Sequence, residues 1–249
     1  MLLMTVLPIC AYAKNTVELS IKKGGTDVAH SPTINYMRFV LLPVLRKMGL
    51  NATINVRKYG YYPKGNGEVT AFVEPAKNLN PLQLENPGKI EIIKGVSVCT
   101  FLAERNVAER QAQRVSDYFK EKGFKTNIQI VNDTSNPLQK GSSLVLWVET
   151  DTGVMFGADA IGELKKTSEK VGEEASEKLW EEISAKPTVD VHLSDLLIPY
   201  MALARGKSSY LTRMVSEHLE TNIWLAEEIL QVKFKVEKLK TLFKIEKVG

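Results

Sequence analysis

The stretch Ser216-Glu217-His218-Leu219-Glu220-Thr221-Asn222-Ile223 carries the most information about both the fold and the chemistry of this chain. Apolar residues recur through and beyond it at helical spacing, namely Leu219, Ile223, Ala226 and Leu230. This spacing predicts the start of an amphipathic helix. Ser216 is the predicted N-cap, because its hydroxyl can accept one of the first free N–H groups. His218 therefore belongs to the first turn of a helix.

A histidine in a first turn has two interpretations. The free amides and the positive end of the helix dipole favour a bound anion there. The same field disfavours the charged imidazolium, so the ring nitrogen of His218 is expected to be neutral and nucleophilic. Such a nitrogen beside a phosphate could attack phosphorus. The alternative is a histidine that only caps or packs, and composition alone favours that alternative.

Length and composition set the limits for the rest of the chain. A chain of 249 residues can bury a sizeable core in one or two domains. Charged residues at 25% and hydrophobic residues at 44% are ordinary for a globular protein, and a net charge of +4 is too small to predict a nucleic-acid partner. Cys10 and Cys99 form no metal-ligand spacing, which indicates a reduced, cytoplasmic protein.

The first thirteen residues are apolar and end in Ala11-Tyr12-Ala13, which imitates a secretory signal. No positive side chain precedes the apolar run, and Pro8 interrupts it. The run is also too short to span a bilayer, so no membrane is predicted. We interpret residues 1–13 as a buried helix whose beginning lies further upstream.

The next sixty residues show regular alternation separated by turn signals. The predicted elements are a strand from Val17 to Gly24-Gly25, a helix from Ser31-Pro32 to about Met48-Gly49, and strands over Thr53–Arg57 and Glu68–Glu74. Between the last two strands, Gly65-Asn66-Gly67 and Lys64 could approach a phosphate backbone, with Tyr61 or Tyr62 as a stacking face. A hairpin turn with aromatic residues packed beneath it is the alternative, and it is favoured for either tyrosine alone.

The remaining two thirds of the chain divide at proline-rich turns. Residues 78–89 are interpreted as a linker. A βαβ-ββα order follows, with strands over Ile90–Phe101, Asn127–Val131, Ser143–Glu149 and Val154–Asp159 and helices over Val107–Lys122 and Ser168–Ile183. After Lys186-Pro187 come an apolar helix from Val191 that ends near Gly206, the helix from Ser216, and short strands over Val232–Val236 and Leu242–Ile245.

Five blocks of this sequence, in order, resemble the RNA 3′-terminal phosphate cyclase family. They are Gly24-Gly25-Thr26-Asp27 with Ser31-Pro32, Gly60-Tyr61-Tyr62-Pro63-Lys64-Gly65-x-Gly67-Glu68-Val69, Phe156–Glu163, His192–Ala204 and His218-x-x-Thr221-Asn222-Ile223. The blocks extend over nearly the whole chain. The resemblance implies an α/β (α+β) fold in which repeated βαβαββ-type units form a large domain that carries a smaller inserted α/β domain. We assign residues 1–86 and 188–249 to the large, catalytic domain and residues 87–187 to the insertion.

The resemblance also implies an ATP-dependent ligase. In the family a histidine, here His218, takes AMP from ATP; the AMP passes to an RNA 3′-phosphate, and the 2′-hydroxyl then closes a 2′,3′-cyclic phosphate. The segment His192-Leu193-Ser194-Asp195-Leu196 is similar to an ATP-contacting stretch, with Leu196 in place of a usual glutamine. Met4 also replaces a glutamine, and Pro32 and Tyr36 resemble one wall of the adenine pocket. For His192 and Tyr36, a half-buried structural role is the alternative.

The implied partners are ATP and RNA 3′ ends, with Mg²⁺ or Mn²⁺ delivered by ATP because the sequence has no metal-ligand cluster. Family members carry an upstream Gly-Glu-Gly-Gly-Gly-Gln segment and phosphate-binding arginines, so the chain is expected to be an N-terminally short member. The apolar helix at residues 1–13 would then expose part of its surface, and a homodimer stays open. The alternatives are an inactive fragment, a non-catalytic cyclase-like protein of ribosome biogenesis, and a small-molecule transferase on a related repeated fold.

Overall fold

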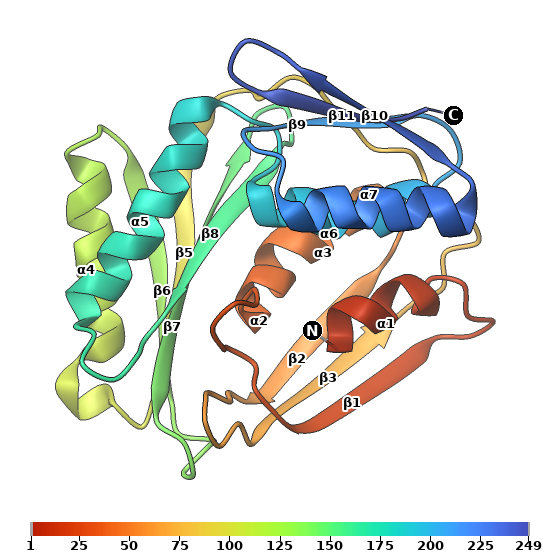
Figure 1. The fold of residues 1–249 in the computed structure, drawn as a ribbon. Helices are drawn as coiled ribbons and strands as arrows, with labels where there is room; N and C mark the ends of the chain where they lie inside the picture. Colours follow the sequence, from red (N-terminus) through yellow and green to blue (C-terminus); the bar gives the residue numbers. More distant parts are fainter. Residues whose placement is uncertain (1, 249) are drawn as a thin grey trace.

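The computed structural model describes residues 2–248; Met1, the first residue of the helix predicted over residues 1–13, and Gly249 lie outside this description. Figure 1 shows three β-sheets with helices packed between and around them. Among the described residues, no helix combines the length and the apolar character needed to cross a membrane.

The N-terminal part forms a helix–strand–helix–strand–strand unit. Its elements are α1 (Leu2–Cys10), β1 (Val17–Gly24), α2 (Ile34–Tyr36), a π-helical turn (Met37–Leu41), α3 (Leu42–Lys47), β2 (Ala52–Lys58) and β3 (Gly67–Val73). The strands form an antiparallel sheet in the order β1-β3-β2. Val69, Ala71 and Val73 of β3 are buried at alternate positions, because one face of the sheet packs on the core.

The helix predicted from Ser31 begins three residues later and is irregular in the middle. Thr33 is its N-cap, and the Thr33 hydroxyl accepts a hydrogen bond of 3.2 Å from the Tyr36 N–H. Further along, the Leu42 N–H donates to the Met37 carbonyl, one residue beyond the α-helical partner. Pro43 follows immediately, and a proline lacks the N–H that the next helical bond would need. The π-helical turn absorbs this local mismatch.

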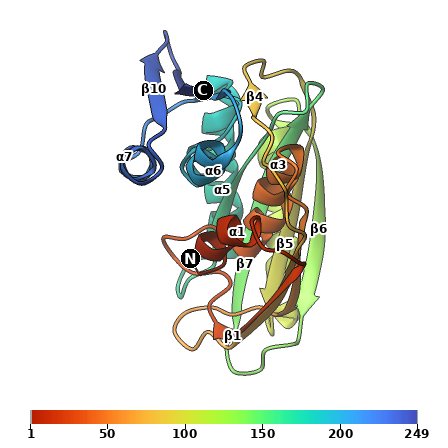
Figure 2. The same ribbon diagram turned by 90° about the vertical axis from the view of Figure 1, so that its right-hand side faces the viewer.

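The C-terminal part forms a second unit around a four-stranded sheet. Its elements are β4 (Gln83–Leu84), α6 (Val191–Leu203), β9 (Ser208–Thr212), α7 (Glu217–Leu230), β10 (Lys233–Lys238) and β11 (Phe243–Val248). The strand order is β10-β11-β9-β4, with β4 parallel to β9 and the other pairs antiparallel. Figure 2 shows α7 outermost on one side of the molecule, with α6 next to it.

The two units share one order of elements. In each, a helix leads into a strand (α1–β1 and α6–β9), a second helix follows (α2–α3 and α7), and two strands close the sheet. In both sheets the last strand lies between the other two, so β1-β3-β2 matches β9-β11-β10. This confirms the predicted α+β fold with repeated units.

Between these units the chain builds a third sheet. Its elements are β5 (Ile90–Thr100), a 3-10 turn (Ala103–Arg105), α4 (Val107–Lys120), β6 (Lys125–Asp133), β7 (Gly141–Thr150), β8 (Met155–Ile161) and α5 (Ser168–Ala185). The order is β6-β5-β7-β8, and α4 and α5 cover one face (Figure 1). On the other face the ring of Phe39 stacks on that of Trp147, with centroids 4.9 Å apart. The boundaries at residues 87 and 187 stay a prediction.

Two short strands were missed in the sequence. Residues 78–89 were expected to form only a linker, but they contain β4, and β9 was not predicted at all. The two strands pair with each other, with Gln83 opposite Ser209 and Leu84 opposite Tyr210. A two-residue strand has no periodicity to detect, and its partner is more than a hundred residues away. Pairing of this kind is decided by tertiary packing rather than by local pattern.

Candidate active site at the start of two helices

Helix α7 begins as the sequence predicts, with Ser216 as its N-cap. The Ser216 hydroxyl accepts a hydrogen bond of 3.0 Å from the Leu219 N–H, and Leu219 anchors the helix in the core. His218 is exposed. Among residues 2–248, the backbone N–H groups of Glu217 and His218 have no hydrogen-bond partner. Two free donors and a histidine ring thus face solvent at the positive end of the α7 dipole.

Helix α6 begins beside a buried carboxylate. The Asp190 carboxylate accepts hydrogen bonds from the Leu193 N–H (2.9 Å), the Tyr36 hydroxyl (2.7 Å) and the Gly157 N–H (2.8 Å). Burial raises the pKa of Asp190, and these three donors oppose the rise. One side chain therefore caps α6 and ties its start to helix α2 and to strand β8.

Asp195 connects the two helix starts. Its carboxylate accepts a hydrogen bond of 2.6 Å from the Ser216 hydroxyl, and its backbone carbonyl accepts one of 3.0 Å from the Asn222 amide. Burial raises the pKa of Asp195, while the Ser216 bond and then the charges of His192 and His218 oppose the rise. Figure 1 shows α6 and α7 running side by side in the same direction. Asp195 therefore lies near both histidines, at the starts of the two neighbouring helices.

The other predicted site residues differ in how accessible they are. Within the ATP-contacting stretch, His192 is exposed and Leu196 is half-buried, but Leu193 and Ser194 point into the core, where Ser194 contacts the Tyr210 hydroxyl at 3.1 Å. The side chains of His192 and Leu196 are therefore accessible to a nucleotide, whereas Asp195 exposes only a small part of its surface.

The residues assigned to the adenine wall lie at different depths. Tyr36 has no exposed surface, and its ring meets the edge of the His192 ring with centroids 6.2 Å apart. Pro32 is half-buried just before α2. Met4 is half-buried on α1, and no hydrogen bond or ring contact among the described residues joins it to His192 or His218. Tyr36 thus supports His192 from behind, whereas Met4 is not brought to the histidines by any contact.

Comparison with known proteins places this sequence in a family. The sequence matches the family model for RNA 3′-terminal phosphate cyclase over residues 1–236. The RNA 3′-terminal phosphate cyclases of Pyrobaculum neutrophilum and Methanosarcina barkeri are each 40% identical to it over 98% of this chain and 70% of their own length. That of Thermococcus gammatolerans is 38% identical over 95% of this chain and 67% of its own. The chain belongs to the RNA 3′-terminal phosphate cyclase family.

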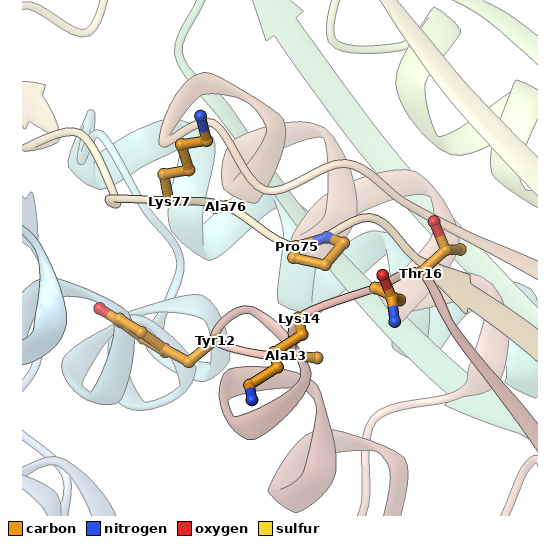
Figure 3. Close-up of a pocket in the computed structure, with 8 residues that line it drawn as sticks. Tyr12, Ala13, Lys14, Thr16, Pro75, Ala76 and Lys77 are labelled. Carbon is orange, nitrogen blue, oxygen red and sulfur yellow. The ribbon is translucent and has the colours of Figure 1, made fainter.

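Two further features bear on what a cyclase of this family would bind. Within residues 2–248 there is no group of three histidine, cysteine, aspartate or glutamate side chains arranged to hold a metal ion. A cavity of about 440 Å³ lies between residues 12–16 and 75–77 (Figure 3). It sits at the far end of α6, because the Tyr12 hydroxyl in its wall donates to the carbonyl of Leu203. This cavity is therefore separate from the two histidines.

Several contacts in this candidate site were not predicted from the sequence. Asp190 precedes an apolar helix, so an N-cap could have been read from the local pattern, but Tyr36 lies 154 positions away. The role of Ser216 as a donor to Asp195 was also missed, since the two are 21 positions apart. Local spacing predicts caps, whereas contacts between distant segments need the fold.

Proposed function

We propose that this chain uses ATP to convert the 3′-terminal phosphate of RNA into a 2′,3′-cyclic phosphate, through AMP held on His218. The observation that carries the proposal is the exposed His218 at the open start of α7, beside Asp195 and His192, in a member of the RNA 3′-terminal phosphate cyclase family. The named relatives are RNA 3′-terminal phosphate cyclases, and the site offers the nucleophile that such a reaction needs.

The first step would transfer AMP to the protein. An imidazole nitrogen of His218 attacks the α-phosphorus of ATP, a phosphorus–nitrogen bond forms, and the bond to pyrophosphate breaks. The free N–H groups of Glu217 and His218 favour negative charge that develops on the phosphate. Nucleotidyl transfer depends mostly on such positioning and charge neutralisation.

The second and third steps would use the RNA end. An oxygen of the 3′-phosphate attacks the phosphorus of His218-bound AMP, so the phosphorus–nitrogen bond breaks and the RNA end carries AMP. The adjacent 2′-hydroxyl then attacks the 3′-phosphorus, and AMP leaves as the ring closes. A divalent cation such as Mg²⁺ or Mn²⁺ would supply charge neutralisation and arrive with the ATP phosphates. The charges of both histidines act on the Asp195 carboxylate, which could also contact the cation.

The nucleotide would lie against the start of α6. His192 and Leu196 offer accessible side chains, and Pro32 lies on the neighbouring segment before α2. Leu193, Ser194 and Tyr36 would act from beneath, by fixing the backbone and the His192 ring. Met4, which was assigned to the same pocket, is half-buried on α1.

The experiment follows conversion of an RNA that bears a radiolabelled 3′-phosphate. With ATP and Mg²⁺ or Mn²⁺, the label should become resistant to phosphatase as the cyclic phosphate forms. His218→Ala should abolish conversion. His30→Ala is the matched control, because His30 is an exposed histidine in the loop before α2 and is not assigned to the site. Conversion by His218→Ala at the wild-type rate would contradict the proposal.

A further inference from the structure

The loop Tyr61–Gly67, between β2 and β3, has no role in the chemistry described so far. Its backbone is held by the neighbouring loop between β6 and β7, which lies at the same lower edge of the molecule (Figure 1). The Asn136 amide donates to the carbonyls of Tyr59 (2.7 Å) and Gly65 (3.0 Å), and the Asn66 amide donates to the Asn136 side-chain oxygen (3.0 Å). Three hydrogen bonds to the neighbouring loop thus give this loop one conformation.

Close packing fixes the same loop from its other side. A side chain at Gly60 or Gly67 would clash with the carbonyl of Gly24, so the two ends of the loop approach β1 as closely as glycine allows. Tyr61 points inward, is buried, and packs on Gly141. The hairpin interpretation from the sequence therefore holds for Tyr61.

Tyr62, the next residue, does the opposite. Its side chain is 82% exposed, although the backbone that carries it is fixed. Lys64 is exposed beside it and, among residues 2–248, has no ion pair. Lys23 is also exposed, and its carbonyl borders the loop at Gly65. An aromatic face with nearby cations is the combination by which proteins bind single-stranded nucleic acid.

We propose that Tyr62 stacks on an unpaired base of the substrate RNA, with Lys64 and Lys23 contacting the adjacent phosphates. The inference rests on the proposed function, because it names the place where the RNA strand leading to the reacting end would lie. The loop is connected to the segment on the nucleotide side of the site, because the Gly60 carbonyl accepts hydrogen bonds from the N–H groups of Thr26 (2.8 Å) and Asp27 (3.1 Å). That segment continues to Pro32 and helix α2.

The test measures binding of a short, fluorescein-labelled single-stranded RNA with a 3′-phosphate, by anisotropy and without ATP. Tyr62→Ala should weaken binding by about fivefold or more, since stacking on one base contributes about that much. Tyr62→Phe, which keeps the ring, should bind within about twofold of wild type. Lys64→Ala should weaken binding and lower the slope of log affinity against log salt by about one.

The control is Tyr12→Ala, which removes a tyrosine that is 50% exposed at the far end of α6 and should leave RNA affinity unchanged. Wild-type affinity in Tyr62→Ala, as expected if the loop docks a protein instead, would overturn the inference. An equal loss in Tyr62→Phe would also overturn it. Labelling of His218 by ATP is measured separately. If labelling fails while Tyr62→Ala still weakens RNA binding, the chemistry proposed for His218 is wrong and the RNA site stands.

Discussion

Helix α2 in the N-terminal unit and helix α7 in the C-terminal unit occupy the same place in the shared order of elements, but their first turns face different surroundings. At α2, the Thr33 N–H donates to the Asp159 carboxylate at 2.7 Å, and Ile34, Asn35 and Tyr36 are buried. At α7, the first N–H groups are free and His218 is exposed. Strand β8, which carries Asp159, covers the start of α2, whereas at the start of α7 Asp195 of α6 bonds only the Ser216 hydroxyl and leaves the first N–H groups free.

The difference indicates which of two equivalent helix starts is free to bind an anion. A helix start attracts anions in either unit, because the dipole and the free amides are intrinsic to helices. In the N-terminal unit a carboxylate of the protein already satisfies that attraction. In the C-terminal unit the first N–H groups stay free, next to the exposed His218 that we propose as the nucleophile. The same fold element thus forms a buried structural contact in one unit and, in our proposal, the reaction site in the other.

The largest loss of stability is expected at Asp190, whose carboxylate links α2, β8 and α6 by hydrogen bonds. Asp190→Ala should lower the free energy of unfolding by about 3 kcal/mol or more, because it leaves three buried donors without an acceptor. Urea denaturation measures this loss. Asp190→Asn keeps an acceptor for part of the network and should lose less. Equal stability of Asp190→Ala and wild type would show that the packing of α2, β8 and α6 does not depend on this carboxylate.

Asp27, a second buried carboxyl group of the N-terminal unit, should make the stability of the fold depend on pH. Burial, with a smaller effect from the Asp159 charge, raises the pKa of Asp27 from 3.8 to about 7, and its Oδ1 has no hydrogen-bond partner among the described residues. The folded chain therefore holds a proton that the unfolded chain releases near pH 4. The resulting cost to stability is absent below about pH 4, grows as pH rises, and is complete above about pH 7.

Asp27→Asn removes that charge, so relative to wild type it should gain stability between pH 5 and pH 8, by up to about 2 kcal/mol. Urea denaturation at the two pH values gives the difference. Glu228→Gln, at an exposed carboxylate on α7, is the matched control and should show no such trend. If the stability difference between Asp27→Asn and wild type is constant across this range, the claim that buried Asp27 keeps its proton in the folded chain is wrong.

The smallest expected change in stability is at the open helix start. Ser216→Ala removes the N-cap of α7 and the hydrogen bond to Asp195, and should lower the free energy of unfolding by about 1 kcal/mol. Its effect on activity should exceed its effect on folding, since it releases the turn that holds His218. Ser216→Thr keeps both bonds and should restore both properties. A loss of stability without any loss of activity would show that Ser216 caps α7 but does not position His218 for the reaction.

The sequence predicted one side of this comparison better than the other. Ser216, the helix after it and the first-turn position of His218 follow from local spacing, because a cap and its helix are close in sequence. The closure of α2 could not be predicted, since Asp159 and Thr33 are 126 positions apart. The same limit hid β4 and β9. It also hid the burial of Tyr36, which the sequence alone left between a pocket wall and a structural residue.

The most direct test of the account is self-labelling of the protein with ATP that carries the label on its α-phosphate, in the presence of Mg²⁺ or Mn²⁺. We expect a covalent label that is lost in acid and stable in alkali, as for a histidine phosphoramidate, and that maps to the peptide containing His218. The label should be absent from His218→Ala and present in His30→Ala. A label that persists in His218→Ala would contradict the claim that the open start of α7 is the reaction site.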